Sequence, residues 1–66
     1  MQITVNGAPH QAAPGTTLAQ LLAELELPVQ AVAVAVNLEV VPRATHAERR
    51  LADGDAVEVV RAVGGG

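Results

Sequence analysis

The sequence contains no cysteine, no aromatic residue and no lysine, and each absence removes a class of function. Without cysteine, the chain can form neither a disulfide nor a thiolate metal site. Without aromatic side chains it has no surface on which nucleic-acid bases could stack, and its net charge of −3 opposes binding to phosphates. We therefore expect no nucleic-acid partner.

The chain has 66 residues, which allows one small domain and leaves no room for a separate cofactor domain. Its two histidines, His10 and His46, have no nucleophile or aspartate beside them at the spacing of a catalytic motif. We expect both at the surface or its boundary. We also expect no metal site and no cofactor bound by this chain, so the sequence favours a protein that is not itself an enzyme.

Long hydrophobic runs are also missing. The longest fully apolar run, residues 31–36, is far too short to cross a bilayer. Met1 leads directly into a strand-like pattern, without the basic and apolar regions of a signal peptide. We expect a cytoplasmic protein with no membrane partner.

The first half of the chain predicts a hairpin. Residues 1–5 alternate apolar and polar side chains, as a half-buried strand does, and Asn6-Gly7 is the strongest short-range signal for a hairpin turn. Residues 8–13 form a weak return strand. Pro9 cannot donate to a strand ladder, so this strand should lie at the edge of the sheet.

A short helix follows. Thr17 and Gln20 have the spacing of a capping box, and Leu27-Pro28 is the expected end, which gives a helix of about ten residues. Its leucines recur at the spacing of one apolar stripe, at Leu18, Leu21, Leu22 and Leu25. A helix of this length needs a sheet to pack on.

The second half predicts three more strands. Residues 31–36 place valines on one face and alanines on the other, and the valine face should meet the leucine stripe. A short strand is expected at 40–41 and the last strand at 56–61. Between them, Thr45 and Glu48 have the spacing of a second capping box, which predicts a single helical turn over 47–50.

The order of these elements is strand, strand, helix, strand, strand, short helix, strand. It predicts an α+β protein with the β-grasp, or ubiquitin-like, fold, in which a mixed sheet of four to five strands packs on one main helix. Residues 1–63 form the domain, and residues 64–66 form a flexible tail.

Two loops could suggest ligand sites. Asp53 and Asp55 flank Gly54, and two carboxylates could bind a hard cation, but the same residues are favoured wherever the backbone reverses. A Ca²⁺ site would also need more oxygen ligands. Residues 15–17 precede a helix and could attract an anion, but they lack the pattern of a phosphate loop. We interpret the two loops as a turn and a helix cap.

Three consecutive glycines, Gly64, Gly65 and Gly66, end the sequence. They bury no side chain and have maximal backbone entropy, so they cannot support the fold. Lacking Cβ atoms, they form a thin segment that could enter a narrow channel of a second protein. Gly66 carries the α-carboxylate that another enzyme could activate. The alternative interpretation is a flexible linker.

The residues just before the glycines are candidates for contact with a partner: Val60, Arg61 and Val63. Arg61 could meet an acidic groove or simply point into solvent. If the odd-numbered valines of the last strand face the helix, Val60 faces outward. It could then form a small apolar patch with Ala33 or Ala35.

Several segments, in this order and spacing, resemble the ThiS/MoaD family of ubiquitin-like sulfur carriers, most closely the ThiS branch. The resemblance covers the whole chain, although Ala44, Thr45 and His46 stand where an aromatic residue is common. The segments are Ile3-Thr4-Val5-Asn6-Gly7, Gly15-Thr16-Thr17-Leu18 before Leu21-Leu22, Val36-Asn37 leading to Val41-Pro42-Arg43, Leu51, Asp53-Gly54-Asp55, Val57-Glu58-Val59-Val60 and Val63-Gly64-Gly65-Gly66.

The resemblance implies that this chain is a carrier on which other enzymes act. The carboxylate of Gly66 would attack the α-phosphate of ATP in a ThiF-like adenylating enzyme, which uses ATP and Mg²⁺. Sulfur from a donor protein would then displace AMP and leave a thiocarboxylate on Gly66. A ThiG-like thiazole synthase would take this sulfur for the thiazole ring of thiamin. The residues expected to contact partners are Gly64, Gly65, Val63, Arg61 and Val60.

Two alternatives stay open. The same tail chemistry could serve another recipient, in a molybdopterin or an amino acid pathway. The chain could instead be a ubiquitin-like binding module whose glycines are a linker.

Overall fold

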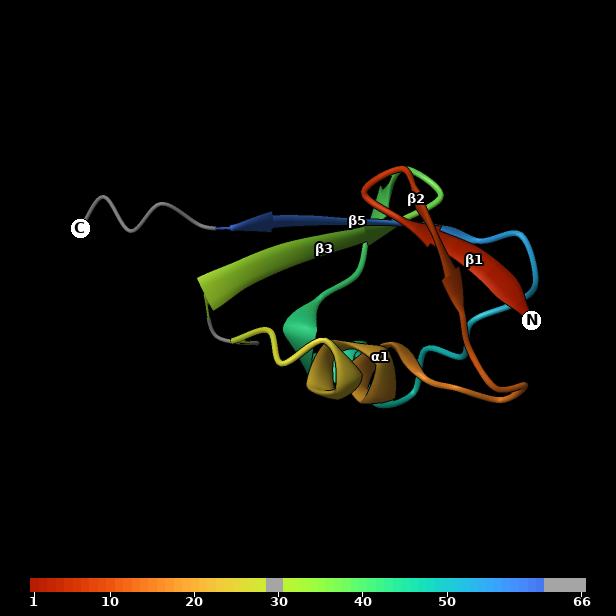
Figure 1. Ribbon diagram of the computed structural model, residues 1–66. Coiled ribbons are helices and arrows are strands. Elements are labelled where there is room, and N and C mark those ends of the chain that lie inside the picture. Colours follow the sequence, from red (N-terminus) through yellow and green to blue (C-terminus); the bar gives the residue numbers. More distant parts are fainter. Residues whose placement is uncertain (29–30, 62–66) are drawn as a thin grey trace.

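The computed structural model of the protein describes residues 1–28 and 31–61. Its elements follow the predicted order (Figure 1). They are β1 (Gln2–Val5), β2 (Ala8–Gln11), α1 (Leu18–Glu24), β3 (Val32–Val36), β4 (Glu39–Val40), the 3₁₀-helix η2 (Arg43–Thr45) and β5 (Ala56–Arg61).

The strands form one five-stranded sheet in the order β2-β1-β5-β3-β4. Strands β1 and β5 are parallel, and the other neighbouring pairs are antiparallel. Helix α1 lies against one face of the sheet (Figure 1). This is the β-grasp arrangement that the sequence predicts, and it places β5 in the centre of the sheet.

The hairpin of β1 and β2 has the two-residue turn that Asn6-Gly7 predicts, and β2 is an edge strand. The register pairs Ile3 with His10. Ile3 is buried, whereas His10 is half-buried, because β2 has a neighbour on one side only. The expected boundary position of His10 is confirmed.

The core lies between α1 and the sheet. Val34 and Val36 of β3 are buried, whereas Ala33 is exposed, so the predicted valine face does meet the helix. Burial of such side chains contributes about 1.5–3 kcal/mol each. The side chains with almost no exposed surface are Ile3, Leu18, Leu21, Leu22, Val34, Val36 and Val57.

Helix α1 has the predicted start but an earlier end. Thr17 accepts a hydrogen bond from Gln20 N, and the Gln20 side chain accepts one from Thr17 N, which completes the capping box. The helix stops at Glu24 and not at Leu27-Pro28 as expected. Leu27 N donates to Leu22 O and Glu26 takes a φ of 55°, which is a Schellman ending with glutamate in place of glycine.

The segment after β3 differs from its prediction in detail. Strand β4 is Glu39–Val40 and not 40–41, and the 3₁₀ turn is Arg43–Thr45 and not a helical turn over 47–50. Thr45 caps no helix: its Oγ1 donates to Pro42 O at 2.9 Å. Pro42 begins the turn, because its fixed φ suits the residue before a 3₁₀ turn.

His46 is the other clear difference from the sequence prediction. Its side chain is only 4% exposed, and its Nε2 lies 3.0 Å from Val41 O. The backbone oxygen of His46 accepts a hydrogen bond from Ala19 N of the helix. The expectation of a surface position is therefore wrong, because this loop packs against α1 and encloses the ring.

Within residues 1–28 and 31–61, no helix has both the length and the apolar character needed to pass through a membrane.

The capping assignments can be tested with Thr17→Ala and Thr45→Ala. Loss of the Thr17 cap should lower the free energy of unfolding by about 1 kcal/mol, because an orphan backbone donor loses its acceptor. Thr45→Ala removes only an exposed hydrogen bond, so its cost should be clearly smaller. Chemical denaturation measures both values, and equal losses would contradict the assignment.

Candidate functional site

The candidate site is the end of strand β5, from which the glycine tail continues. Val63 and Gly64 to Gly66 lie outside the described residues. Val60 and Arg61 are the predicted contact residues that the structure describes, and both are exposed.

Val60 and Arg61 lie on opposite faces of the sheet. Arg61 pairs with Val32 and shares the inner face with Val57 and Val59, toward α1. Val60 pairs with Ala33 and faces outward. A partner that contacts both residues must therefore hold the end of β5 from two sides.

The outward face carries an exposed apolar surface, which we call the outer patch: Leu38, Val40 and Val60. Their exposed fractions are 87%, 73% and 63%. Ala33, Ala35 and Glu58 join them around a hollow of about 220 Å³. The small predicted patch of Val60 with Ala33 or Ala35 thus exists. Sequence reasoning missed Leu38 and Val40.

Leu38 occupies an unfavourable backbone position. Asn37 and Leu38 form a two-residue hairpin turn with φ values of 52° and 68°. The first hairpin uses Asn6 and Gly7 at the same two positions, with φ values of 51° and 84°. Leucine at positive φ is rare, because its Cβ approaches the following carbonyl oxygen. This exposed leucine costs stability and gains none from burial, which is typical of a residue with a role in binding.

Two asparagine side chains hold β5 at its ends. Asn37 Oδ1 accepts from Ala56 N at 3.0 Å, at the start of the strand. Asn6 Oδ1 accepts from Val59 N at 2.8 Å, near the root of the tail. The sequence suggested only a turn role for Asn6. Its hydrogen bond extends the contact between β1 and β5 past the point where β1 ends.

The inner face has an apolar groove at the same end of β5, which we call the inner groove. Its volume is about 380 Å³, and Asn6 and Arg61 are its polar residues. The remaining lining residues are Val5, Leu25, Leu27, Val32 and Val59. The groove lies between the end of α1 and the root of the tail.

The aspartates of the loop before β5 serve the turn, as predicted. Asp55 accepts hydrogen bonds from the Asn37 side chain and from Ala52 N, and Asp53 accepts one from Gln2 N. These bonds occupy the carboxylates and close the turn. In the described part of the chain, histidines and carboxylates form no cluster of three that could hold a metal ion.

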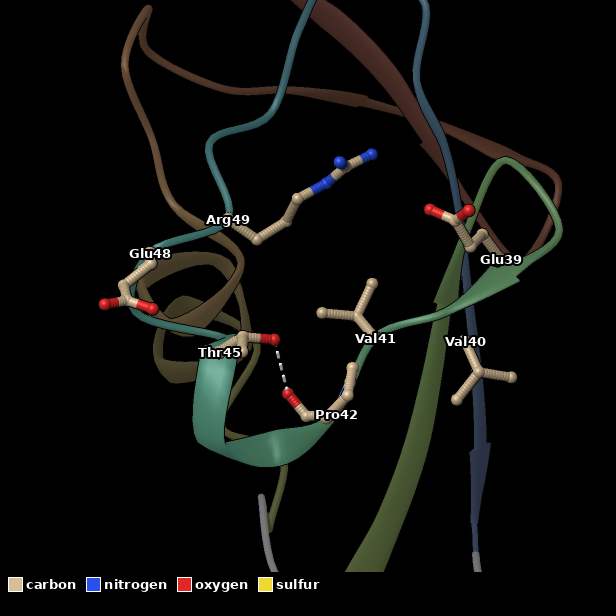
Figure 2. Close-up of a pocket in the computed structure, with 7 residues that line it drawn as sticks. All are labelled: Glu39, Val40, Val41, Pro42, Thr45, Glu48 and Arg49. Carbon is tan, nitrogen blue, oxygen red and sulfur yellow. Dashed lines mark hydrogen bonds between the residues drawn. The ribbon is translucent and has the colours of Figure 1, made fainter.

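A further pocket lies between β4 and the η2 turn (Figure 2). Its volume is about 240 Å³. Figure 2 shows that the Arg49 side chain extends across it toward Glu39, whereas Glu48 points away. Thr45 donates its hydroxyl proton to Pro42 O. The pocket shares Val40 with the outer patch but has no lining residue from β5, and we assign it no role.

Comparison with known proteins finds the model of the ThiS family matching residues 3–66. The chain is 35% identical to the sulfur carrier protein ThiS of Escherichia coli over the full length of both. The crystal structure of the thiamine biosynthesis protein ThiS from Geobacter metallireducens has a TM-score of 0.89 and 36% identity, with both chains fully covered.

Two thiazole synthases also match the whole chain. They come from Magnetococcus marinus, at 46% identity, and Paramagnetospirillum magneticum, at 38%. The chain spans only 20% of the length of each.

The Asn6 hydrogen bond can be isolated with Asn6→Gly, which keeps the positive φ and removes only the side chain. We expect the Val59 amide to exchange with solvent faster and the free energy of unfolding to fall by about 1 kcal/mol. Asn37→Gly is the matched control, since it should expose the Ala56 amide and leave Val59 protected. Amide exchange by NMR reports both, and an unchanged Val59 rate in Asn6→Gly would refute this role.

Proposed function

The chain belongs to the ThiS family, and from this premise we propose that it is a sulfur carrier for thiazole formation in thiamin biosynthesis. The observation that carries the proposal is the combination of a ThiS-like domain with three consecutive glycines shortly after its central strand. Such a chain acts as a protein substrate for other enzymes and is not itself an enzyme.

The proposed chemistry takes place at the carboxylate of Gly66. A carboxylate is a poor acyl donor until one of its oxygens becomes part of a good leaving group. In an adenylating enzyme similar to ThiF, the carboxylate oxygen attacks the α-phosphorus of ATP and pyrophosphate leaves. The outer sulfur of a persulfide on a donor protein then displaces AMP and forms an acyl disulfide with Gly66. A thiol attacks the donor sulfur of that disulfide and breaks its S–S bond, which leaves a disulfide on the donor and frees the thiocarboxylate on Gly66.

The composition suits this role. The chain has no cysteine that could attack its own activated end and no lysine that could form an amide with it. Positioning of the reactants and stabilisation of charge around Mg²⁺ and ATP are then supplied by the partner. The carrier contributes the acyl group and a surface that docks it.

We assign the recipient as a thiazole synthase similar to ThiG. The match of two thiazole synthases over all 66 residues of this chain supports this assignment. Each of those thiazole synthases therefore contains, in one polypeptide, a segment similar to this chain.

Docking to the adenylating enzyme uses the outer patch. Leu38, Val40 and Val60 expose aliphatic surface on the outer face, which extends from Leu38 beside the start of β5 to Val60 near the root of the tail, and Leu38 is kept at a strained position. Arg61 on the inner face adds a charge next to Val60, at the end of β5. An apolar surface with an acidic margin on the partner fits this arrangement.

Deletion of Gly66 tests the proposed reaction. With the cognate adenylating enzyme and ATP, we expect release of pyrophosphate from the intact carrier and none above background from the truncated one. The thermal unfolding midpoint should be the same for both, because a glycine has no side chain to bury in a core. Unchanged pyrophosphate release after deletion would overturn the proposal.

Leu38→Gly tests the docking surface, because its two effects have opposite signs. Relief of the positive φ should raise the free energy of unfolding by about 0.5–1 kcal/mol. Loss of the exposed side chain should weaken binding to the adenylating enzyme at least about fivefold. Glu26→Gly is the matched control, since it also relieves a positive φ but leaves the outer patch intact. If both variants bind as tightly as the unaltered carrier, Leu38 has no docking role.

A further inference from the structure

On the side of β5 that faces β1, backbone hydrogen bonds reach only as far as Val59 N. Asp55 O and Val57 O accept hydrogen bonds from Thr4 N and Asn6 N, and Val59 N donates to Asn6 Oδ1. Asn6 then begins the turn into β2, which lies on the far side of β1. In residues 1–28 and 31–61, no strand pairs with β5 on this side beyond Val57.

The backbone of β5 continues past that point with polar groups on the same side. Alternate residues of a strand direct their N–H and C=O groups to the same neighbour. The backbone groups of residues 55, 57 and 59 point toward β1. The carbonyl of Val59 and the N–H of Arg61 therefore point the same way, into the space past the end of β1. An open edge of this kind pairs readily with an extended chain.

The inner groove lies where the side chains of an added strand would point. A residue directly opposite Val59 or Arg61 shares their inner face, as Val5 does opposite Val57. The walls there are aliphatic, and Arg61 is the one charged residue among those that line the groove. One extended segment could therefore pair its backbone with the open edge and place its alternate side chains in the inner groove.

We propose that a strand of the adenylating enzyme pairs with β5 at Val59 and Arg61 and places an aliphatic side chain in the inner groove. An acidic side chain of that strand meets Arg61 at the rim. This inference rests on the proposed function, and it adds a second contact surface on the opposite face of the sheet from the outer patch.

The length of the tail limits where the occupant can lie, and the reaction favours the adenylating enzyme. Residues 62–66 can reach at most about 18 Å beyond Arg61, at ~3.6 Å per residue. An enzyme that binds Gly66 in its active site must therefore lie close to the end of β5. Attack on the α-phosphorus requires a carboxylate held in position, and strand pairing at the root of the tail removes much of its freedom.

Amide exchange of the ¹⁵N-labelled carrier tests the pairing. With the cognate adenylating enzyme and without ATP, exchange of the Arg61 amide should slow at least about tenfold. The Val60 amide is the internal control: it faces β3 opposite Ala33 and should be protected already in the free carrier. An Arg61 amide that exchanges equally fast in the free and bound carrier overturns the inference.

A second variant removes only the proposed donor. In a carrier made by chemical synthesis, an ester in place of the amide before Arg61 should weaken binding about fivefold, as expected for one lost hydrogen bond. The free energy of unfolding should stay the same, because no strand within residues 1–28 and 31–61 pairs with this amide. Unchanged affinity contradicts the pairing.

The outcomes separate this inference from the function. If the carrier is adenylated but Arg61 is not protected, strand pairing fails and the carrier function stands. Protection by thiazole synthase alone shows that the occupant is wrong. If no adenylation occurs, the proposed function fails and this inference fails with it.

Discussion

The structure depends on the parallel pairing of β1 with β5, which fixes the last strand in the middle of the sheet. Val57 is fully buried beside Val5. The side chains of Asn37 and Asn6 hold the strand at its beginning and near its end. The tail thus starts from a well-anchored strand, although glycines have no side chains to pack in a core. A carrier needs this combination, because the reactive end must be thin while its origin must be well positioned.

Stability and function are separated along the chain. The leucines of α1 and the valines of β3 and β5 form the core, whereas the exposed apolar residues gather on the outer face of the sheet. Leu38 shows the separation most clearly. The turn that carries it would be more stable with glycine, the residue that occupies the same position of the Asn6-Gly7 turn. A residue that lowers stability without burying its side chain is explained better by contact with a partner than by folding.

Periodicity and turn chemistry in the sequence predicted the element order, the packing of the valine face of β3 on the leucine stripe, the capping box at Thr17 and the β-grasp fold. These features depend on residue patterns that are local in the sequence. The predictions were wrong where tertiary contacts determine the structure. The burial of His46 results from a loop closing over α1, and Glu26 ends the helix early because Leu27 packs on the core. The hydrogen bond from Val59 N to the Asn6 side chain joins strands far apart in sequence, so no local signal could reveal it.

The central claim is that Gly66 carries sulfur, and intact-mass measurement of the carrier tests it most directly. The protein would be incubated with its adenylating enzyme, Mg²⁺, ATP and a sulfur donor. We predict a mass gain equal to the exchange of one oxygen for one sulfur, located by fragmentation at the terminal glycine. A carrier that keeps its original mass when every component is present and active would contradict the account.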